Sequence, residues 1–223
     1  MKARSIVSAA VLFLSLGHAP VFAAGYVTVD AIDTTTRALT RDAFPWVAMV
    51  YGSSDALVAL GSSQDSVGPI DGMMNLPPLT LESGDGNVIV EMDNNLIVET
   101  SVVDGAASEA TGSTYGLFMI GPMTDVTFTT HVLLHADGAP INLSAGMCID
   151  AICRSSQIDL GTMAAAYWFN VANASDEVEY VYASIGASAT TPAVPEPGEA
   201  ALLLVGLACL SLRGVARIRL HAY

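Results

Sequence analysis

Basic residues are scarce over most of the chain. Between residues 24 and 197 there is no lysine and there are three arginines, against 21 aspartates and glutamates, so this region has a net charge of −18. Proteins bind nucleic acids by neutralising phosphates with lysine and arginine, and an acidic surface repels anionic lipid headgroups. The composition therefore excludes nucleic acid as a partner and favours divalent cations or neutral and basic surfaces.

Motifs for nucleophilic catalysis and for phosphate binding are also missing. The chain has no Gly-x-Ser-x-Gly elbow, and the absence of lysine from residues 24–197 rules out a phosphate-binding loop there. His131 and His135 have the spacing of a helical metal site, but they fall in an alternating, strand-like segment, where residues four apart are separated by roughly 13 Å. We therefore predict no metal ligands, no cofactor and no catalytic residues.

The many acidic residues leave two alternatives open. A pair of carboxylates could hydrolyse a glycan, because the separation that this chemistry requires is spatial and does not show in a sequence. Acid-rich turns at residues 83–87 and 91–95 could give oxygen ligands to Ca²⁺, although neither matches the spacing of an EF-hand loop. A membrane-anchored periplasmic glycan hydrolase and a calcium-dependent binding module are thus alternatives to a protein without enzymatic activity.

Cysteine is rare as well. Cys209 lies in an apolar run near the C-terminus, so Cys148 and Cys153 are the only pair in the central region. In an exported protein such a pair is typical of a disulfide that closes a small loop. Two free buried thiols are the alternative, whereas a structural zinc site would need four ligands.

The first 23 residues have the features of a secretory signal peptide. Lys2 and Arg4 supply positive charge, residues 6–16 form an apolar run of eleven residues that is expected to be helical, and Val21-Phe22-Ala23 has small residues at the positions that signal peptidase reads. Cleavage is predicted after Ala23. Eleven apolar residues are fewer than the roughly 20 of a membrane-spanning helix, which argues against a permanent N-terminal anchor.

Apolar and polar residues alternate with period two through the central region. Residues 125–136 show this pattern, which is typical of a half-buried strand. Residues 86–93 and 96–103 show it too, and Asp93-Asn94-Asn95 between them favours a tight turn, so a β-hairpin is predicted there. Further strands are expected at residues 26–32, 45–52, 78–83, 114–121, 165–172 and 179–186.

Many short strands without a long amphipathic helix indicate a mainly β domain. We predict that residues 24–186 form an antiparallel β-sandwich or jelly roll. A short helix at residues 53–60 is an alternative for that one segment. The glycosylation pattern occurs at Asn142 and Asn173, but such short motifs often arise by chance.

Four aromatic residues fall on two of the expected strands: Tyr167, Trp168, Tyr180 and Tyr182. Aromatic residues that alternate on strands usually face inward, so we expect these side chains in the core. If they lined a concave outer face instead, they would indicate glycan binding.

The C-terminal region changes composition twice. Residues 187–197 contain small residues and prolines and are predicted to be an extended linker that ends in Pro-Glu-Pro. Residues 198–223 contain an apolar run of thirteen residues, 200–212, which is expected to be a short membrane helix, followed by a basic tail. By the positive-inside rule, Arg213, Arg217 and Arg219 stay cytoplasmic and the β-domain lies on the other side of the membrane.

This arrangement resembles the PEP-CTERM sorting signal of Gram-negative bacteria. The motif is carried by Val194, Pro195, Glu196 and Pro197, and the apolar run, the arginines and the chain end follow it in order. The resemblance covers about thirty residues and says nothing about the domain that precedes them. It implies recognition by a membrane-embedded exosortase, cleavage near Pro-Glu-Pro, and delivery across the inner membrane to the cell surface or to the extracellular polysaccharide of a biofilm.

The two chain ends and the acidic β-domain together suggest one hypothesis. We expect an exported envelope or extracellular-matrix protein with a structural, adhesive or polysaccharide-associated role and no enzymatic activity. Its expected partners are signal peptidase, the exosortase, the membrane through the C-terminal helix, and extracellular polysaccharide.

Overall fold

A computed structural model describes residues 22–71, 75–103, 106–138 and 140–193. Most of the predicted signal peptide lies outside these residues, and so do the Val194 to Pro197 motif, Arg213, Arg217 and Arg219. Among the described residues, no helix is long and apolar enough to cross a membrane.

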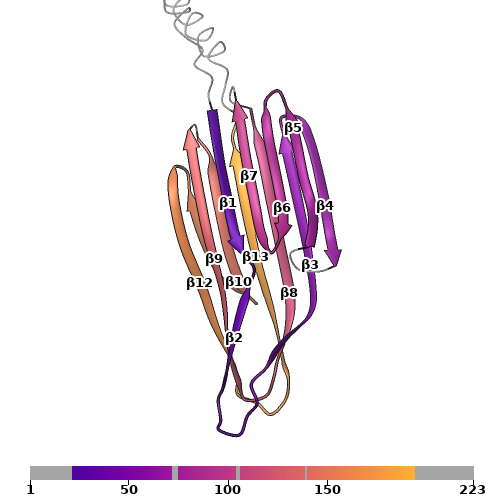
Figure 1. Cartoon of the computed structure of the whole chain (residues 1–223), viewed down its shortest axis with the longest axis vertical. Coiled ribbons are helices and arrows are strands. Elements are labelled where there is room, and N and C mark those ends of the chain that lie inside the picture. The colour runs from indigo at the N-terminus through magenta and orange to yellow at the C-terminus, as the bar shows by residue number, and fades with distance from the viewer. Residues whose placement is uncertain (1–21, 72–74, 104–105, 139, 194–223) are drawn as a thin grey trace, which may run out of the picture. The chain divides into compact units, whose positions relative to one another are not determined.

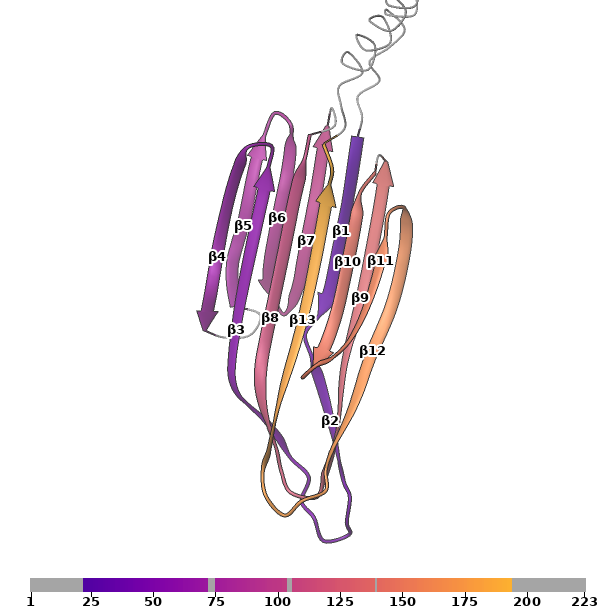
Figure 2. The same ribbon diagram turned by 180° about the vertical axis from the view of Figure 1, so that it is seen from behind.

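The described residues form two antiparallel sheets that pack face to face (Figures 1 and 2). Sheet A has the strand order β12-β9-β1-β7-β6-β5. Strand β2 pairs with the start of β9, whereas β1 pairs with its end. The strands of sheet A are β1 (Phe22–Asp30), β2 (Asp33–Ala38), β5 (Asn75–Ser83), β6 (Gly86–Asp93), β7 (Asn95–Val103), β9 (Thr124–Gly138) and β12 (Gly161–Asn173).

Sheet B has the strand order β11-β10-β13-β8-β3-β4. Its strands are β3 (Val47–Leu60), β4 (Ser63–Asp71), β8 (Ser108–Ile120), β10 (Asn142–Ile149), β11 (Ile152–Ile158) and β13 (Glu179–Thr191). The first residue of β1 and the last residue of β13 lie at the same end of the sandwich, and the loops that precede β3, β9 and β13 lie at the other end (Figure 1). The predicted mainly β, antiparallel sandwich is therefore confirmed.

The core lies between the two sheets and follows directly from the alternation in the sequence. In β9 the odd positions are exposed or half-buried and the even positions from Val126 to Leu134 are buried. Phe128 of β9 meets Phe118 of β8 edge to face across the core, with 5.3 Å between the ring centroids. Burial of each large apolar side chain contributes about 1.5–3 kcal/mol, so the paired inner faces hold the sheets together.

The predicted hairpin is confirmed, and the alternative helix at residues 53–60 is wrong. Strands β6 and β7 pair from Gly86 opposite Val102 to Asp93 opposite Asn95, and Asn94 has a φ of 63° in the turn between them. Residues 53–60 belong to β3, which is held on one side by β8 and on the other by β4. This two-sided pairing, which is not visible in the sequence, decides the conformation of the segment.

Strands β2, β4, β10 and β11 were not expected from the sequence. Three of them, β2, β4 and β11, are mostly exposed, so they lack the apolar alternation that marks a half-buried strand. Strand β10 does alternate, with Leu143, Ala145, Met147 and Ile149 buried. Its period of two was therefore present in the sequence but was not used to predict a strand.

Two boundaries differ from those expected. Strand β13 continues to Thr191, so residues 187–191 belong to the domain and not to the linker. The strand continues because Ala187 and Ala189 are small enough to pack in the core, and because the Thr191 hydroxyl lies 2.6 Å from that of Ser108. At the other end, Ala23 is buried in β1 opposite Val102, so cleavage after Ala23 would remove the first two residues of β1.

Cys148 and Cys153 form a disulfide that joins β10 to β11. The two residues lie directly opposite each other in the register of this hairpin. In the turn between them, Asp150 has a φ of 50°, and its carboxylate accepts a hydrogen bond from the Tyr182 backbone amide at 2.9 Å. The disulfide therefore closes an edge hairpin of sheet B, and the Asp150 hydrogen bond holds the turn of this hairpin against the neighbouring strand β13.

Replacing both Cys148 and Cys153 with serine should lower the free energy of unfolding by about 2 kcal/mol, because the closed loop is short and constrains the unfolded chain only modestly. Urea unfolding of the exported protein measures the effect, with the Cys209→Ser variant as the matched control, which should unfold like the wild type. An unchanged urea midpoint in the double variant would contradict the prediction.

Candidate functional site

The four aromatic residues expected in the core divide between the two sheets. Tyr167 is buried, whereas Trp168 is 54% exposed and Tyr180 and Tyr182 are each 58% exposed, so the core prediction is wrong for three of them. Trp168 lies on the outer face of sheet A because its neighbours Tyr167 and Phe169 face the core. The tyrosines of β13 are on sheet B, so the three exposed rings do not form one glycan-binding surface.

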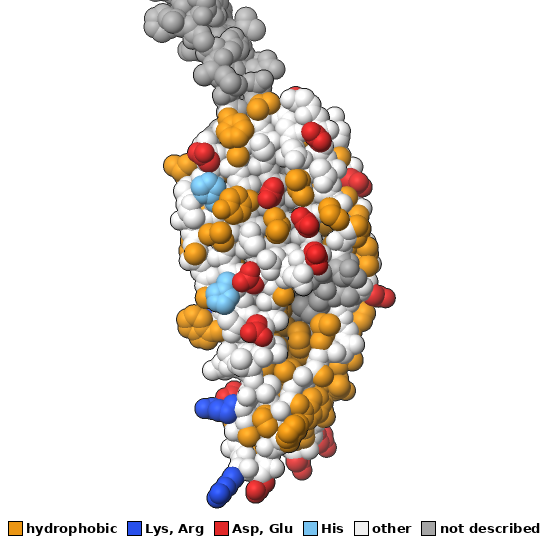
Figure 3. All heavy atoms as spheres, in the orientation of Figure 1, with side chains coloured by type: hydrophobic (Ala, Val, Ile, Leu, Met, Phe, Trp, Pro, Cys, Tyr) orange, Lys and Arg blue, Asp and Glu red, His pale blue; other side chains and the backbone are white. Residues whose placement is uncertain are grey.

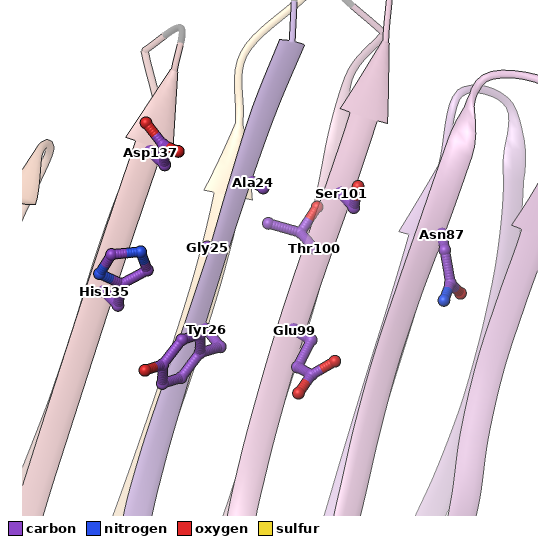
Figure 4. Close-up of a pocket in the computed structure, with 9 residues that line it drawn as sticks. All are labelled: Ala24, Gly25, Tyr26, Asn87, Glu99, Thr100, Ser101, His135 and Asp137. Carbon is purple, nitrogen blue, oxygen red and sulfur yellow. The ribbon is translucent and has the colours of Figure 1, made fainter.

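A hollow of about 240 Å³ lies on the outer face of sheet A (Figure 4). It is lined by residues of four neighbouring strands: Ala24, Gly25, Tyr26, Asn87, Glu99, Thr100, Ser101, His135 and Asp137. The register brings these residues together from distant parts of the chain. His135, Tyr26 and Glu99 form one row across β9, β1 and β7. Asp137, Ala24 and Ser101 form the adjacent row, and Asn87 of β6 extends it.

Small residues of β1 form the floor of this hollow. Ala24 faces outward with only a methyl group, so it leaves space between Asp137 and Ser101. Gly25 faces the core, where a Cβ would lie 2.6 Å from the Cδ1 atom of Ile141. Sheet B therefore packs directly against the backbone of β1 below the hollow, and a larger residue at Gly25 would push the floor outward.

Two aromatic rings form one wall. The rings of Tyr26 and His135 have their centroids 5.3 Å apart and are tilted by 35°. His135 Nδ1 lies 2.7 Å from the Thr162 hydroxyl, which orients the imidazole. The wall thus combines apolar ring faces with a phenolic hydroxyl and a ring nitrogen that can form hydrogen bonds.

Polar groups surround the floor (Figure 4). The carboxylates of Glu99 and Asp137 accept hydrogen bonds, and the Ser101 hydroxyl can donate or accept them. The Oδ1 atom of Asn87 is shielded from solvent and has no hydrogen-bond partner among the described residues. An aromatic wall together with carboxylates, an amide and a hydroxyl suits a ligand that has apolar C–H faces and many hydroxyl groups.

The two carboxylates of the hollow are far apart. Glu99 and Asp137 are separated by two strand spacings and by two residues along the strands, which places their backbone positions about 12 Å apart. Glycoside hydrolases hold their two carboxyl groups about 5–9.5 Å apart. In Figure 4 the Glu99 and Asp137 side chains also point away from each other, so the hollow does not bring these two carboxyl groups together as such a pair.

The geometry also bears on the alternative of metal binding. Among residues 22–71, 75–103, 106–138 and 140–193, no group of three or more His, Cys, Asp or Glu side chains is placed to hold a metal ion. The acidic turns at residues 83–87 and 91–95 thus do not form such a group. His131 faces solvent and lies 3.5 Å from the Asp30 carboxylate, while His135 belongs to the hollow.

The outer face of sheet A is acidic around the hollow (Figure 3). Asp30, Glu91, Glu99 and Asp137 project from it. Arg37, the basic residue of β2, lies at the other end of this face and is paired with Asp125 at 2.8 Å. Such a face repels anionic polymers and accepts neutral or cationic ones.

The two glycosylation motifs have different environments. Asn173 is only 1% exposed, and its side-chain amide donates hydrogen bonds to three backbone carbonyls. Asn142 is exposed at the start of β10, where its Oδ1 accepts a hydrogen bond from Gln157. Asn173 therefore has a structural role in the folded domain and is not accessible for modification.

Comparisons with protein-family models, with curated proteins and with solved structures found no match. Of the residues of the hollow, the sequence singled out only His135, and that as a possible metal ligand with His131. Tyr26 and His135 were placed on expected strands, but only the register of β1 with β7 and β9 shows that they meet Glu99.

Proposed function

We propose that the chain is an exported envelope or extracellular-matrix protein whose β-domain binds polysaccharide at the hollow on the outer face of sheet A. An exosortase sorts it through the signal at Val194 to Pro197. The observation that carries the binding role is the row of His135, Tyr26 and Glu99, an aromatic wall beside hydrogen-bonding groups on an open surface.

Separate chemical observations support the proposed location and the proposed ligand. The Cys148–Cys153 disulfide is of the kind that persists in oxidising compartments outside the cytoplasm. The net charge of −18 over residues 24–197 favours a neutral or cationic polymer over an anionic one. Glu99 and Asp137 point away from each other (Figure 4), which argues for binding rather than hydrolysis by this pair.

Tyr26→Ala should weaken polysaccharide binding about tenfold, because loss of an aromatic contact of roughly 1.4 kcal/mol corresponds to that factor. Affinity electrophoresis of the exported protein in gels that contain dextran, hydroxyethyl cellulose or partly deacetylated chitin measures it, with anionic alginate as the charge control. Glu99→Gln keeps the shape of the site and should also weaken binding about tenfold, because the charge that strengthens the hydrogen bond to this side chain is lost.

Tyr180→Ala is the matched control, since it removes an exposed tyrosine from the other sheet. It should bind like the wild type. The proposal fails if none of the neutral or cationic polymers retards the wild-type protein, or if Tyr180→Ala weakens binding as much as Tyr26→Ala.

A further inference from the structure

Strand β12 forms an edge of sheet A. Among the described residues it pairs with β9 alone, so one side of its backbone has no strand partner. Its 13 residues, Gly161–Asn173, include no proline and no charged residue. A long, uncharged edge strand is a template for pairing with another strand.

The other four edge strands of the described residues carry features that hinder such pairing. Strand β2, which pairs with β9 alone, has only six residues and includes Asp33 and Arg37. Strand β5 contains Pro77 and Pro78, with a shift of register between Leu76 and Leu79. Strand β4 contains Pro69 and is irregular where it pairs with β3. Strand β11 has only seven residues and includes Arg154. Prolines, bulges, short length and charge all protect edges from association, so β12 differs from the rest.

A projecting ring and an apolar hollow lie next to each other on this strand. Trp168 points outward and is 54% exposed. A second hollow of about 530 Å³, separate from the candidate glycan site, is lined by Ala164, Ala165 and Ala166 of β12 and by neighbouring residues that include Asp30, His131 and Leu133. Ala164, Ala166 and Trp168 are two residues apart from one another, so their side chains lie on the same face of β12. The Trp168 ring and the floor of the hollow therefore face the same side of the sheet.

We propose that β12 pairs antiparallel with β12 of a second copy of this chain, around a two-fold axis at Ala166. In this register Trp168 lies opposite Ala164 of the second copy, and its ring fills the apolar hollow there. The same contact forms twice, as a two-fold interface requires. Sheet A then continues across the interface, and the backbone groups of both edges become hydrogen-bonded.

Charge also favours a second copy at this edge. Two molecules with a net charge of −18 over residues 24–197 repel each other on most of their surfaces. Strand β12 contributes no carboxylate, and the Arg154 Cζ atom lies 5.4 Å from the centroid of the Trp168 ring. The edge strand therefore adds no negative charge of its own to the interface, and Asp30, the carboxylate of the hollow, lies 3.5 Å from His131. This inference goes beyond the proposed function, because it uses none of the residues of the glycan site.

Symmetric disulfide cross-linking of the full chain in the cell envelope tests the register. Cysteines placed at Ala166 would lie directly opposite each other, about 4.5–5.5 Å apart, which is within disulfide range. Asn170→Cys is the matched control on the same face of the same strand. Its two copies would be about eight residue positions apart, roughly 26 Å, which is too far for a bond.

Ala166→Cys should give a product of twice the chain mass on a non-reducing gel, at a yield at least about tenfold above Asn170→Cys, because pairing places the two thiols at a high effective concentration. The wild-type chain is the control for any cross-linked product that forms through Cys209. Adding Trp168→Ala to Ala166→Cys should reduce the yield severalfold. Equal yields from both cysteines, no product from either, or a product of another mass would overturn the proposal.

Discussion

Replacing Asn173 with alanine is expected to lower the free energy of unfolding by roughly 3–5 kcal/mol. The Asn173 amide donates hydrogen bonds to the carbonyls of Ile120, Gly121 and Glu177 at 3.1, 3.1 and 2.8 Å. Its Oδ1 atom accepts hydrogen bonds from the backbone and the hydroxyl of Ser175. Each buried polar group left without a partner costs about 1–3 kcal/mol, and this side chain serves several such groups at once.

The physical consequence is a loss of connection between two loops. Asn173 ties the turn between β8 and β9 to the loop between β12 and β13, which a backbone hydrogen bond from Met123 to Ser175 also joins. Urea unfolding measures the effect, and Asn142→Ala is the matched control because it changes the exposed asparagine of the other glycosylation motif. The control should change stability by no more than about 0.5 kcal/mol. Equal losses in the two variants would contradict the assigned role of Asn173.

Glu196→Ala should abolish release of the protein from the membrane. The sorting motif that we propose for the exosortase has Glu196 between Pro195 and Pro197, and its two prolines disfavour a helix at this position. Without the carboxylate, the processing enzyme loses the charged group of its recognition sequence. A tagged wild-type chain should therefore move from the inner membrane to the surface or medium, whereas the variant stays in the membrane fraction.

Fractionation with intact-mass measurement separates the outcomes, since release shortens the chain and retention does not. Glu199→Ala is the control, because it removes the nearest acidic residue outside the motif, and it should be released normally. Cells without the exosortase should retain both forms. If wild type and Glu196→Ala stay in the membrane alike in cells that have the enzyme, the proposed sorting is wrong.

The sandwich could be predicted from the sequence because burial on one face of a strand leaves a local period of two. Residues 86–103 and 125–136 show this period. The first range forms the hairpin of β6 and β7, and the second belongs to β9, which pairs with β12. The period does not say which of two alternating aromatics faces the core. In β12, Tyr167 and Phe169 face inward and Trp168 faces outward, because β9 pairs with them in that register.

The candidate site could not be predicted in the same way. Tyr26, Glu99 and His135 lie on strands that are distant in the chain, and no local pattern connects them. They meet because β1 pairs with both β7 and β9. The register is set by the fit of all the inner side chains at once, including the close approach of Ile141 at Gly25.

The sequence by itself determined the strand-forming character of the domain and its negative charge, and it predicts the processing signals, since these depend on composition and on residues close together in the chain. The tertiary structure decided which faces are exposed, where the edges of the sheets lie and which side chains share a surface. These depend on pairing between distant strands, whose free energy comes from packing of the whole core rather than from any one segment.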